Sequence, residues 1–350
     1  MTKKDPESGT EPVPDEAPQQ PASQDPAPQS PDEVAIPADA PTSQPPASSA
    51  RHEVPAPPPL PKTIFDVIYE AADVNVPKQR IAEEIRGIIK RSSLANIYDF
   101  IFLYDDSSQI SRFTSNKIYS AVTDDSHDSR KPLFLLLHTG GGKVEPAYLI
   151  SKCCRKTAPK FVAAVPRFAK SAGTLIALGA DEIHMGIISE LGPIDPQIGD
   201  YPALGLGSAV EHIAKLCTKH PEAVEMLAKY LASNLNLHHL GYFERVSESA
   251  VQYAERLLLG RPLPPNQTPK IVADRFVYGY KDHGFVIDKE EALEILGPEI
   301  VKSDTAEYKL ANQIHEYLEN SVNLAYRVFK NHNCRILGDL NRGILVTENH

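Results

Sequence analysis

Short continuous apolar runs alternate along much of this chain with stretches in which apolar residues recur every three or four positions. A continuous apolar run is typical of a strand buried on both faces, and the wider spacing indicates an amphipathic helix. The expected strands are 98–106, the apolar part of 132–142, 161–165 and 182–185, and the expected helices are 78–93, 111–123, 144–157 and 171–179. Successive strand–helix units of this length predict parallel strands joined by right-handed crossovers, which is an α/β fold.

The pattern becomes mainly helical in the C-terminal part of the chain. Amphipathic stretches occupy much of 208–260, and a further long helix near 306–331 is expected to close the domain. Between them, Asp288 and Glu291 have the spacing of an N-cap residue and its partner three positions later. This pair predicts a capped helix that ends at Gly297.

The first 62 residues show neither the continuous apolar runs nor the helical apolar spacing. Of the 31 prolines in the chain, 17 precede residue 62, mixed mainly with Ala, Ser, Gln, Asp and Glu. Such a segment buries too little apolar surface to offset the entropy lost on ordering. We therefore expect a disordered tail over 1–62 and one folded domain over 63–350.

Charge and hydropathy limit the classes of partner. The formal net charge is −10, and about six of these charges lie in the tail, which has ten acidic and four basic residues. Neither part contains the dense Lys/Arg stripe of a nucleic-acid-binding protein, so no nucleic-acid partner is expected. No apolar run approaches the roughly 20 residues of a transmembrane helix, and no signal peptide is evident, so we expect a cytoplasmic protein. The four cysteines have no metal-type spacing and predict neither a disulfide framework nor a metal site.

Three consecutive glycines, Gly140 to Gly142, end the stretch 132–142 after its apolar part and precede an expected helix. Glycine adopts backbone conformations closed to other residues and lets bare N–H groups approach a ligand. An oxyanion hole, a phosphate site and a tight structural turn all use this geometry. A phosphate site is disfavoured, because neither the P-loop ending nor the GxGxxG spacing is present.

Ser171 opens an apolar helix directly after a strand and a loop. A serine at this place is often only an N-cap. However, the small residues Ala172 and Gly173 leave its hydroxyl accessible, and a helix N-terminus stabilises negative charge beside it. Because neighbouring parallel strands end at one edge of the sheet, we expect Ser171 and the glycines to meet in a crevice there.

Three motifs carry a resemblance to a known family: HTGGG at 138–142, KSAGTLIALGADEI at 170–183 and LGPIDPQIG at 191–199. In this order and spacing they resemble the Clp-protease and signal-peptide-peptidase A superfamily, and most closely its serine dehydrogenase proteinase family. The resemblance extends over about 95–300. It implies a Clp/crotonase-like spiral of βα units with mostly parallel strands and C-terminal helices, no cofactor, and assembly into a homo-oligomer.

The resemblance also implies the site residues. Ser171 matches the nucleophile, and the N–H groups of Ala172 and of Gly141 or Gly142 match the oxyanion hole. This chain has Gly140 where the family more often has proline.

The general base and its orienting carboxylate are less directly indicated. The family is thought to use serine, aspartate and histidine in that chain order, and Asp195 and His283 fit this order. An aspartate between prolyl segments is also typical of a turn. The alternatives for the carboxylate and the base are Asp200, Asp274, Asp282, His138, His184 and His212. Lys170 is expected to face solvent or substrate, and Asp181 to be structural.

The function expected from these residues is that of a soluble serine peptidase, which hydrolyses a peptide or protein substrate through an acyl-enzyme on Ser171. One alternative is an acyl-thioester enzyme that uses the glycines to polarise a thioester carbonyl without Ser171. Another is a catalytically weak oligomeric scaffold whose tail recruits partners. Labelling with a serine-reactive fluorophosphonate distinguishes the peptidase from both.

Overall fold

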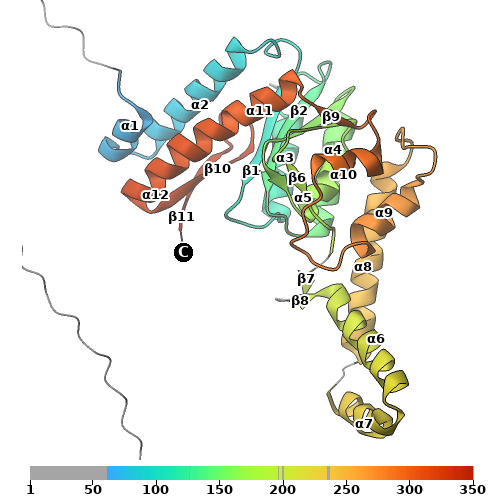
Figure 1. Ribbon diagram of the computed structural model, residues 1–350. Helices are drawn as coiled ribbons and strands as arrows, with labels where there is room; N and C mark the ends of the chain where they lie inside the picture. Colours follow the sequence, from blue (N-terminus) through green and yellow to red (C-terminus); the bar gives the residue numbers. More distant parts are fainter. Residues whose placement is uncertain (1–60, 126, 196, 199–200, 235–236, 350) are drawn as a thin grey trace, which may run out of the picture. The chain divides into compact units, whose positions relative to one another are not determined.

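The computed structural model describes residues 61–125, 127–195, 197–198, 201–234 and 237–349 (Figure 1). The predicted disorder of 1–62 falls almost wholly outside these ranges. Within them, the chain begins with α1 (Ile64–Glu70) and α2 (Asn75–Arg91). The Thr63 side chain caps α1 by accepting a hydrogen bond from the Asp66 N–H at 3.3 Å, and the Asp66 carboxylate accepts one from the Thr63 N–H at 2.8 Å. This reciprocal pair is a capping box.

A mostly parallel sheet forms the centre of the domain. Its main path runs β11 (Ile344–Glu348), β10 (His332–Gly338), β1 (Asp99–Asp105), β2 (Leu133–Thr139), β3 (Phe161–Val165), β5 (Glu182–Met185) and β9 (Val301–Ser303). All neighbouring strands from β1 to β9 pair in parallel, whereas β10 is antiparallel to both β1 and β11. Two short strands, β4 (Phe168–Ala169) and β6 (Glu190–Leu191), continue the sheet beyond β2. The predicted α/β fold with mostly parallel strands is confirmed.

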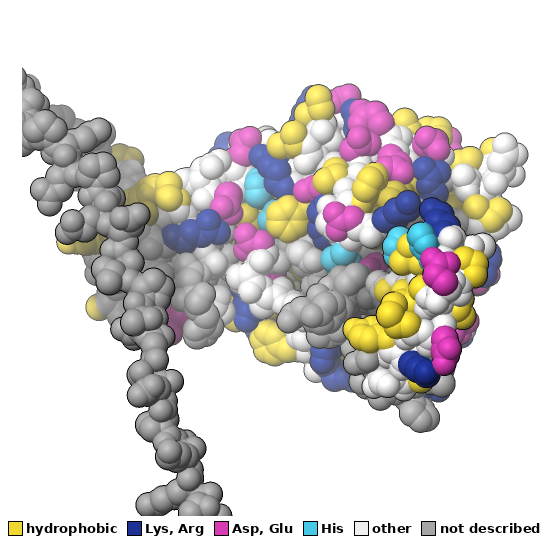
Figure 2. Space-filling model, turned by 60° about the horizontal axis from the view of Figure 1, so that its bottom comes forward, with side chains coloured by type: hydrophobic (Ala, Val, Ile, Leu, Met, Phe, Trp, Pro, Cys, Tyr) yellow, Lys and Arg dark blue, Asp and Glu magenta, His cyan; other side chains and the backbone are white. Residues whose placement is uncertain are grey.

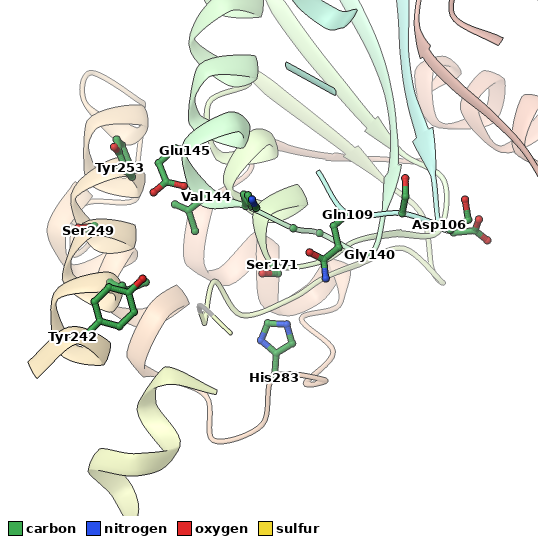
Figure 3. A pocket seen from close by; sticks show the side chains of 16 residues that line it. Asp106, Gln109, Gly140, Val144, Glu145, Ser171, Tyr242, Ser249, Tyr253 and His283 are labelled. Atoms are coloured by element: carbon green, nitrogen blue, oxygen red, sulfur yellow. The ribbon is translucent and has the colours of Figure 1, made fainter. Parts of the chain in front are cut away.

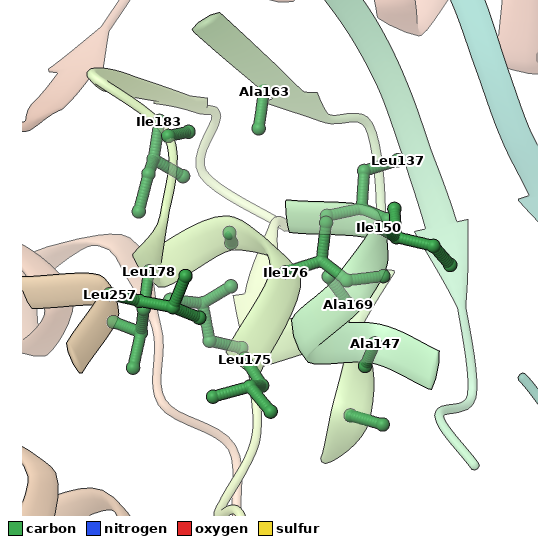
Figure 4. Packing of buried hydrophobic residues seen from close by; sticks show 14 of the residues in the cluster. Leu137, Ala147, Ile150, Ala163, Ala169, Leu175, Ile176, Leu178, Ile183 and Leu257 are labelled. Carbon is green, nitrogen blue, oxygen red and sulfur yellow. The ribbon is translucent and has the colours of Figure 1, made fainter. Parts of the chain in front are cut away.

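Helices cover both faces of the sheet, because β1, β2 and β3 present apolar side chains to each face. Along β2, Leu135 and Leu137 enter one core while Phe134 and Leu136 enter the other, as the two-residue period of a strand requires. The first face packs against α3 (Arg112–Thr123), α4 (Val144–Thr157), α5 (Ala172–Leu178) and the C-terminal half of α8. Figure 4 shows this core, where Leu137 of β2 lies near Ile150 of α4 and Ile176 of α5.

The second face packs against α1, α2, α11 (Ala306–Tyr317) and the turns that follow α11. These are a π-helical segment, η2 (Leu318–Asn323), and α12 (Leu324–Lys330). They match the long helix expected near 306–331, but this helix does not close the domain. The hairpin β10–β11 follows it and adds two antiparallel strands beside β1. The expectation was wrong because β10 mixes partly exposed and buried positions and has no continuous apolar run.

The segment predicted to be helical over 208–260 contains α6 (Ala203–Lys219), the short 3₁₀ helix η1 (Pro221–Ala223), α7 (Val224–Asn234) and α8 (Leu237–Leu258). A two-stranded hairpin of β7 (Gln197–Ile198) and β8 (Tyr201–Pro202) leads into it. The C-terminal half of α8 enters the core through Ala250, Ala254 and Leu258. By contrast, α6, α7 and the first half of α8 extend away from the sheet (Figure 1). We call residues 203–246 the helical arm.

Two further helices, α9 (Pro269–Tyr278) and α10 (Lys289–Leu296), follow the arm. The Asp288 side chain accepts a hydrogen bond from the Glu291 N–H at 2.8 Å, and Gly297 ends α10 with a positive φ of 83°. Both features of this predicted helix are confirmed. The loop between α9 and α10 carries His283.

Candidate active site

The glycine loop, residues 140–142, lies at the carboxyl end of β2 and is hydrogen-bonded to the segment that follows β1. The Ile110 N–H donates to the Gly141 carbonyl at 2.8 Å, and the Lys143 N–H donates to the Ile110 carbonyl at 2.9 Å. Gly141 and Gly142 have positive φ angles of 108° and 147°. A Cβ atom on Gly142 would lie 2.3 Å from the Ile110 nitrogen, so only glycine fits there.

Ser171 directly precedes α5 in a conformation that is uncommon for a residue with a side chain, with φ 49° and ψ −115°. Neighbouring hydrogen bonds hold this turn: the Lys170 N–H donates to the Thr139 carbonyl at 3.0 Å, and the Gly173 N–H donates to the Lys170 carbonyl at 2.7 Å. The Ser171 side chain makes no capping hydrogen bond to α5. A role as a simple N-cap therefore does not explain this serine, whereas strained residues of this kind cluster at functional sites.

The glycine loop is in contact with Ser171. A Cβ atom on Gly141 would lie 2.9 Å from the Ser171 Cβ and 3.4 Å from the Ala172 nitrogen. The Ala172 N–H is in the first position of α5, where N–H groups have no acceptor within the helix. The Gly141 N–H donates to Thr139 Oγ1 at 3.2 Å. The Gly142 N–H points away from the segment with which this residue forms a parallel bridge. Of the three predicted donors, Gly141 is thus the one whose N–H already has a side-chain acceptor.

Asp195 and His283 lie close together in the fold. Asp195 is buried, with 6% of its surface exposed, and its Oδ2 lies 4.0 Å from His283 Nδ1. Backbone hydrogen bonds join their segments: Leu191 and Ile287 exchange N–H···O bonds of 2.9 and 3.1 Å, and the Ile194 N–H donates to the Phe276 carbonyl at 2.8 Å. Two segments far apart in the sequence are thereby brought together.

The surroundings of His283 lower its pKa. Burial makes the largest contribution, and the nearby Lys170 ammonium acts in the same direction. The Asp282 carboxylate and the main chain of Asp195 oppose the shift without cancelling it. The imidazole is therefore neutral at physiological pH and able to accept a proton.

Ser171, His283 and the glycine loop line one pocket of about 630 Å³. Figure 3 shows the imidazole of His283 directed into the same space as Ser171, with Gln109 and Gly140 beside it. The opposite wall is one face of α8, formed by Tyr242, Val246, Ser249 and Tyr253. Of the predicted site residues, Ser171, Gly141, Gly142 and His283 thus line one pocket, and Asp195 lies behind His283; among the hydrogen bonds of the described residues, none joins Ser171 to His283.

The competing carboxylates occupy other environments. Asp274 forms an exposed ion pair with Lys270 at 2.5 Å, and Asp282 accepts the Gly284 N–H at 3.0 Å in a turn. Asp200 lies outside the described residues. Asp195 Oδ2 lies 4.0 Å from His283 Nδ1, and the exposed Asp282 carboxylate, next to His283 in the chain, also acts on the pKa of this histidine.

The competing histidines have other partners. His138 projects from β2 toward the face opposite α5 and stacks on Tyr104, with ring centroids 4.7 Å apart. Burial, aided by repulsion from His315 and Arg167, lowers the pKa of His138 to about 3. His184 lies 2.8 Å from Thr305 Oγ1 and is buried, and His212 is exposed on the helical arm. None of these three lines the pocket of Ser171.

Lys170 and Asp181 both form ion pairs. The Lys170 ammonium lies 2.6 Å from the Glu190 carboxylate, with 19% of its side chain exposed, so it does not face solvent freely. Of the two roles expected for Lys170, substrate binding is the one left open. Asp181 accepts the Phe161 N–H at 2.7 Å and pairs with Arg261, in agreement with a structural role.

Two parts of the pocket were not expected from the sequence: the segment 106–109 after β1 and the α8 wall. The wall residues are spaced by four, three and four positions, which is the period of one helix face. That spacing was readable in the sequence. Its position opposite Ser171 was not, because it depends on how α8 returns to the body of the domain.

Metal-binding groups, membrane-spanning helices and surface charge were also considered for the described ranges. No group of three or more His, Cys, Asp or Glu in these ranges is arranged to hold a metal ion. Among the helices in the same ranges, none combines the length and apolar character needed to cross a bilayer. Figure 2 shows one face of the molecule, on which Lys and Arg side chains are interspersed with Asp and Glu.

Solved structures with similar chain paths include two proteases. One is a serine-to-alanine mutant of the 1510-N membrane-bound stomatin-specific protease, with a TM-score of 0.40 and 15% identity, covering 71% of this chain and 95% of that chain. Another is ClpP1 from Listeria monocytogenes, with a TM-score of 0.37 and 11% identity, covering 65% of this chain and 99% of that chain.

Sequence comparisons give two relatives and a family. Two uncharacterized proteins of Methanocaldococcus jannaschii, MJ0137 and MJ1495, are 42% and 36% identical over 115 and 110 residues, which are 33% and 31% of this chain and 36% and 34% of theirs. The chain thus spans about a third of the length of these relatives. Residues 78–228 match the model of the ClpP-like SDH-type serine proteinases. This match confirms the resemblance of the three motifs, and we conclude that the segment 78–228 belongs to the ClpP-like SDH-type serine proteinase family.

Proposed function

We propose that this protein is a serine peptidase that cleaves peptide bonds through an acyl-enzyme on Ser171. The observation that carries the proposal is the environment of this serine. It is held at φ 49° against Gly141 and shares a pocket with His283. Its side chain makes no capping hydrogen bond. The match of residues 78–228 to a family of serine proteinases supports the same reaction.

The proposed reaction begins when His283 removes the proton from Ser171 Oγ as this oxygen attacks the substrate carbonyl carbon. The carbonyl electron pair moves to its oxygen, and the N–H groups of Ala172 and of Gly142 or Gly141 stabilise the resulting oxyanion. Collapse of this intermediate breaks the C–N bond, and the amine leaves with the proton from His283. A water molecule then hydrolyses the ester by the same steps, with His283 again as base.

Asp195 has a supporting role in this proposal. His283 Nδ1 is the ring nitrogen recorded near the Asp195 carboxylate, and in this proposal Nε2 accepts the proton of Ser171. The separation of 4.0 Å is longer than a hydrogen bond, and such bonds often shorten only when substrate binds. Asp195 would then fix the tautomer of His283 and stabilise the imidazolium that forms during the reaction.

The oxyanion role is tested at Gly142. Replacement with valine should slow acylation by about 100- to 1000-fold, the usual cost of one lost oxyanion donor. The added Cβ would meet the backbone of Ile110 and displace the loop. The measurement is the rate of fluorophosphonate labelling, with circular dichroism as the check on folding. Gly207→Val on the helical arm is a control, because a Cβ there meets no atom within 4 Å. Wild-type labelling in a folded Gly142→Val protein would remove the oxyanion role.

We also propose that the protein forms a homo-oligomer in which the helical arm is covered by another copy. Of the side chains described between residues 205 and 246, none is buried. Large apolar groups are exposed there, including Met226 at 65% and Tyr230 at 62%. These two residues lie four positions apart on one face of α7, and burying them against a second copy would remove apolar surface from water.

The oligomer proposal predicts a change in mass. Combining Met226→Glu with Tyr230→Glu should lower the molar mass measured by light scattering after size-exclusion chromatography. Lys229→Ala, on the same helix, removes only an exposed ion pair with Glu225 and should leave the mass unchanged. An unchanged assembly in the double variant, or a wild-type protein that is already a monomer, would contradict the proposal.

A further inference from the structure

The hydroxyl of Thr174 lies between two backbone segments that lead to the active site. The short strands β4 and β6 pair in parallel, with Ala169 opposite Leu191. Beyond this pair, the segment after β4 leads to Ser171 and the segment after β6 leads to Asp195. Thr174 is in the first turn of α5, and none of its surface is exposed.

At the next position beyond the β4–β6 pair, the Thr174 hydroxyl replaces a direct backbone hydrogen bond between the two segments. The Gly192 N–H donates to Thr174 Oγ1 at 2.9 Å. The same oxygen lies 2.7 Å from the Ala169 carbonyl and 2.8 Å from the Gly192 carbonyl. A hydroxyl has one proton, so it donates to one of these carbonyls at a time. Instead of bonding directly, the two backbones are separated by one side-chain oxygen.

The distance between the segment leading to Ser171 and the segment leading to Asp195 is also limited by a direct contact beside Thr174. A Cβ atom on Gly192 would lie 2.8 Å from Lys170 Cδ and 3.4 Å from Lys170 Cα, so the two segments already touch beside the bridge. The segment that carries Asp195 is also held farther along by the hydrogen bond from Ile194 to Phe276. Loss of the bridging oxygen would leave buried peptide groups unpaired, which drives the backbone to move until they find partners.

We propose that Thr174 is a positioning residue, whose hydroxyl sets the separation between Ser171 and the segment carrying Asp195 and thereby the placement of His283. The inference rests on the proposed function. Thr174 does not line the pocket and so does not contact substrate. Its influence passes through the two backbones that it joins.

Matched substitutions separate this role from simple packing. Thr174→Val keeps the shape of the side chain and removes the oxygen, whereas Thr174→Ser keeps the oxygen and removes a methyl group. Thr174→Val should lower the rate of fluorophosphonate labelling by at least about tenfold, because truncation leaves two buried backbone groups without their partner. Thr174→Ser should stay within about threefold of wild type. All rates are measured well below each melting temperature.

The pH dependence of labelling provides a second readout. The main chain of Asp195 raises the pKa of His283. Displacing this segment in Thr174→Val should therefore move the acid midpoint of the labelling rate to lower pH, and Thr174→Ser should restore it. A folded Thr174→Val protein with a lower melting temperature but the wild-type rate and midpoint would show that Thr174 only packs, and would overturn the inference.

Two further measurements keep the inference separate from the proposed function. If the wild-type protein is not labelled, the proposed function fails, but an NMR titration of His283, assigned with His283→Ala, still tests Thr174. A lower titration midpoint in Thr174→Val than in wild type and Thr174→Ser supports the positioning role, and an equal midpoint refutes it. If Thr174→Val does not fold, Thr174→Cys replaces the oxygen with a larger, weaker acceptor, and the same shifts are expected.

Discussion

Replacing Ser171 with alanine should abolish fluorophosphonate labelling and peptide hydrolysis together while leaving the fold intact. The reagent and the substrate both require the Ser171 oxygen as nucleophile, and no other group in the proposed reaction can replace it. The substitution should cost less than about 1 kcal/mol of folding free energy, the usual value of a helix cap, because the Ser171 side chain makes no capping hydrogen bond.

The measurement is mass-spectrometric mapping of the labelled peptide, together with thermal unfolding of each variant. Ser249 lines the same pocket from α8, and its hydroxyl donates to the Arg245 carbonyl at 2.9 Å. Ser249→Ala is therefore a matched control that should keep wild-type labelling. A label on a serine other than Ser171 would contradict the proposal. Thioester turnover that survives Ser171→Ala would favour the acyl-thioester alternative instead.

Replacing His283 with alanine should lower peptide hydrolysis by about a million-fold, and replacing Asp195 with asparagine by about 10,000-fold, as in other serine triads. Labelling should fall in the same order. The first change removes the base, and the second removes the negative charge that orients it and stabilises its protonated form. Because such residues act as one unit, adding either change to Ser171→Ala should cost little more than Ser171→Ala alone. His212→Ala, on the helical arm, should have no effect on labelling.

The pH profile gives this prediction a definite sign. His283 must be neutral to accept the serine proton, and its pKa is lowered by burial and by Lys170. Labelling by the wild-type protein should therefore rise with pH to a plateau, with an acid midpoint below the ordinary histidine value of about 6.5. A midpoint above this value, or a full rate in His283→Ala, would refute the assignment of His283 as the base.

The local spacing of apolar residues was sufficient to predict most helices and strands around the central sheet. The helix 144–157 and the strands 161–165 and 182–185 have the predicted bounds, because each is defined by its own apolar spacing and its neighbouring turns. The β10–β11 hairpin was missed for the opposite reason. The longest continuous apolar run in the hairpin is the three-residue stretch 344–346 of β11, and β10 is stabilised by pairing with β1, which lies far away in the sequence.

The sequence alone determined the candidate nucleophile, because Ser171 and the glycine loop follow successive parallel strands, whose ends must meet at one edge of the sheet. The resemblance of the motifs also indicated Asp195 and His283, and the tertiary structure adds that His283 lines the pocket of Ser171 and that its Nδ1 lies 4.0 Å from Asp195 Oδ2. His283 reaches the pocket because the Leu191–Ile287 bridge ties its loop to β6, and the α8 wall faces Ser171 because α8 returns to the core. Likewise, Thr174 reads in the sequence as one more buried helix residue. Its role emerges only from the two carbonyls and the N–H around its hydroxyl, since contacts between distant segments leave no periodic signal in the chain.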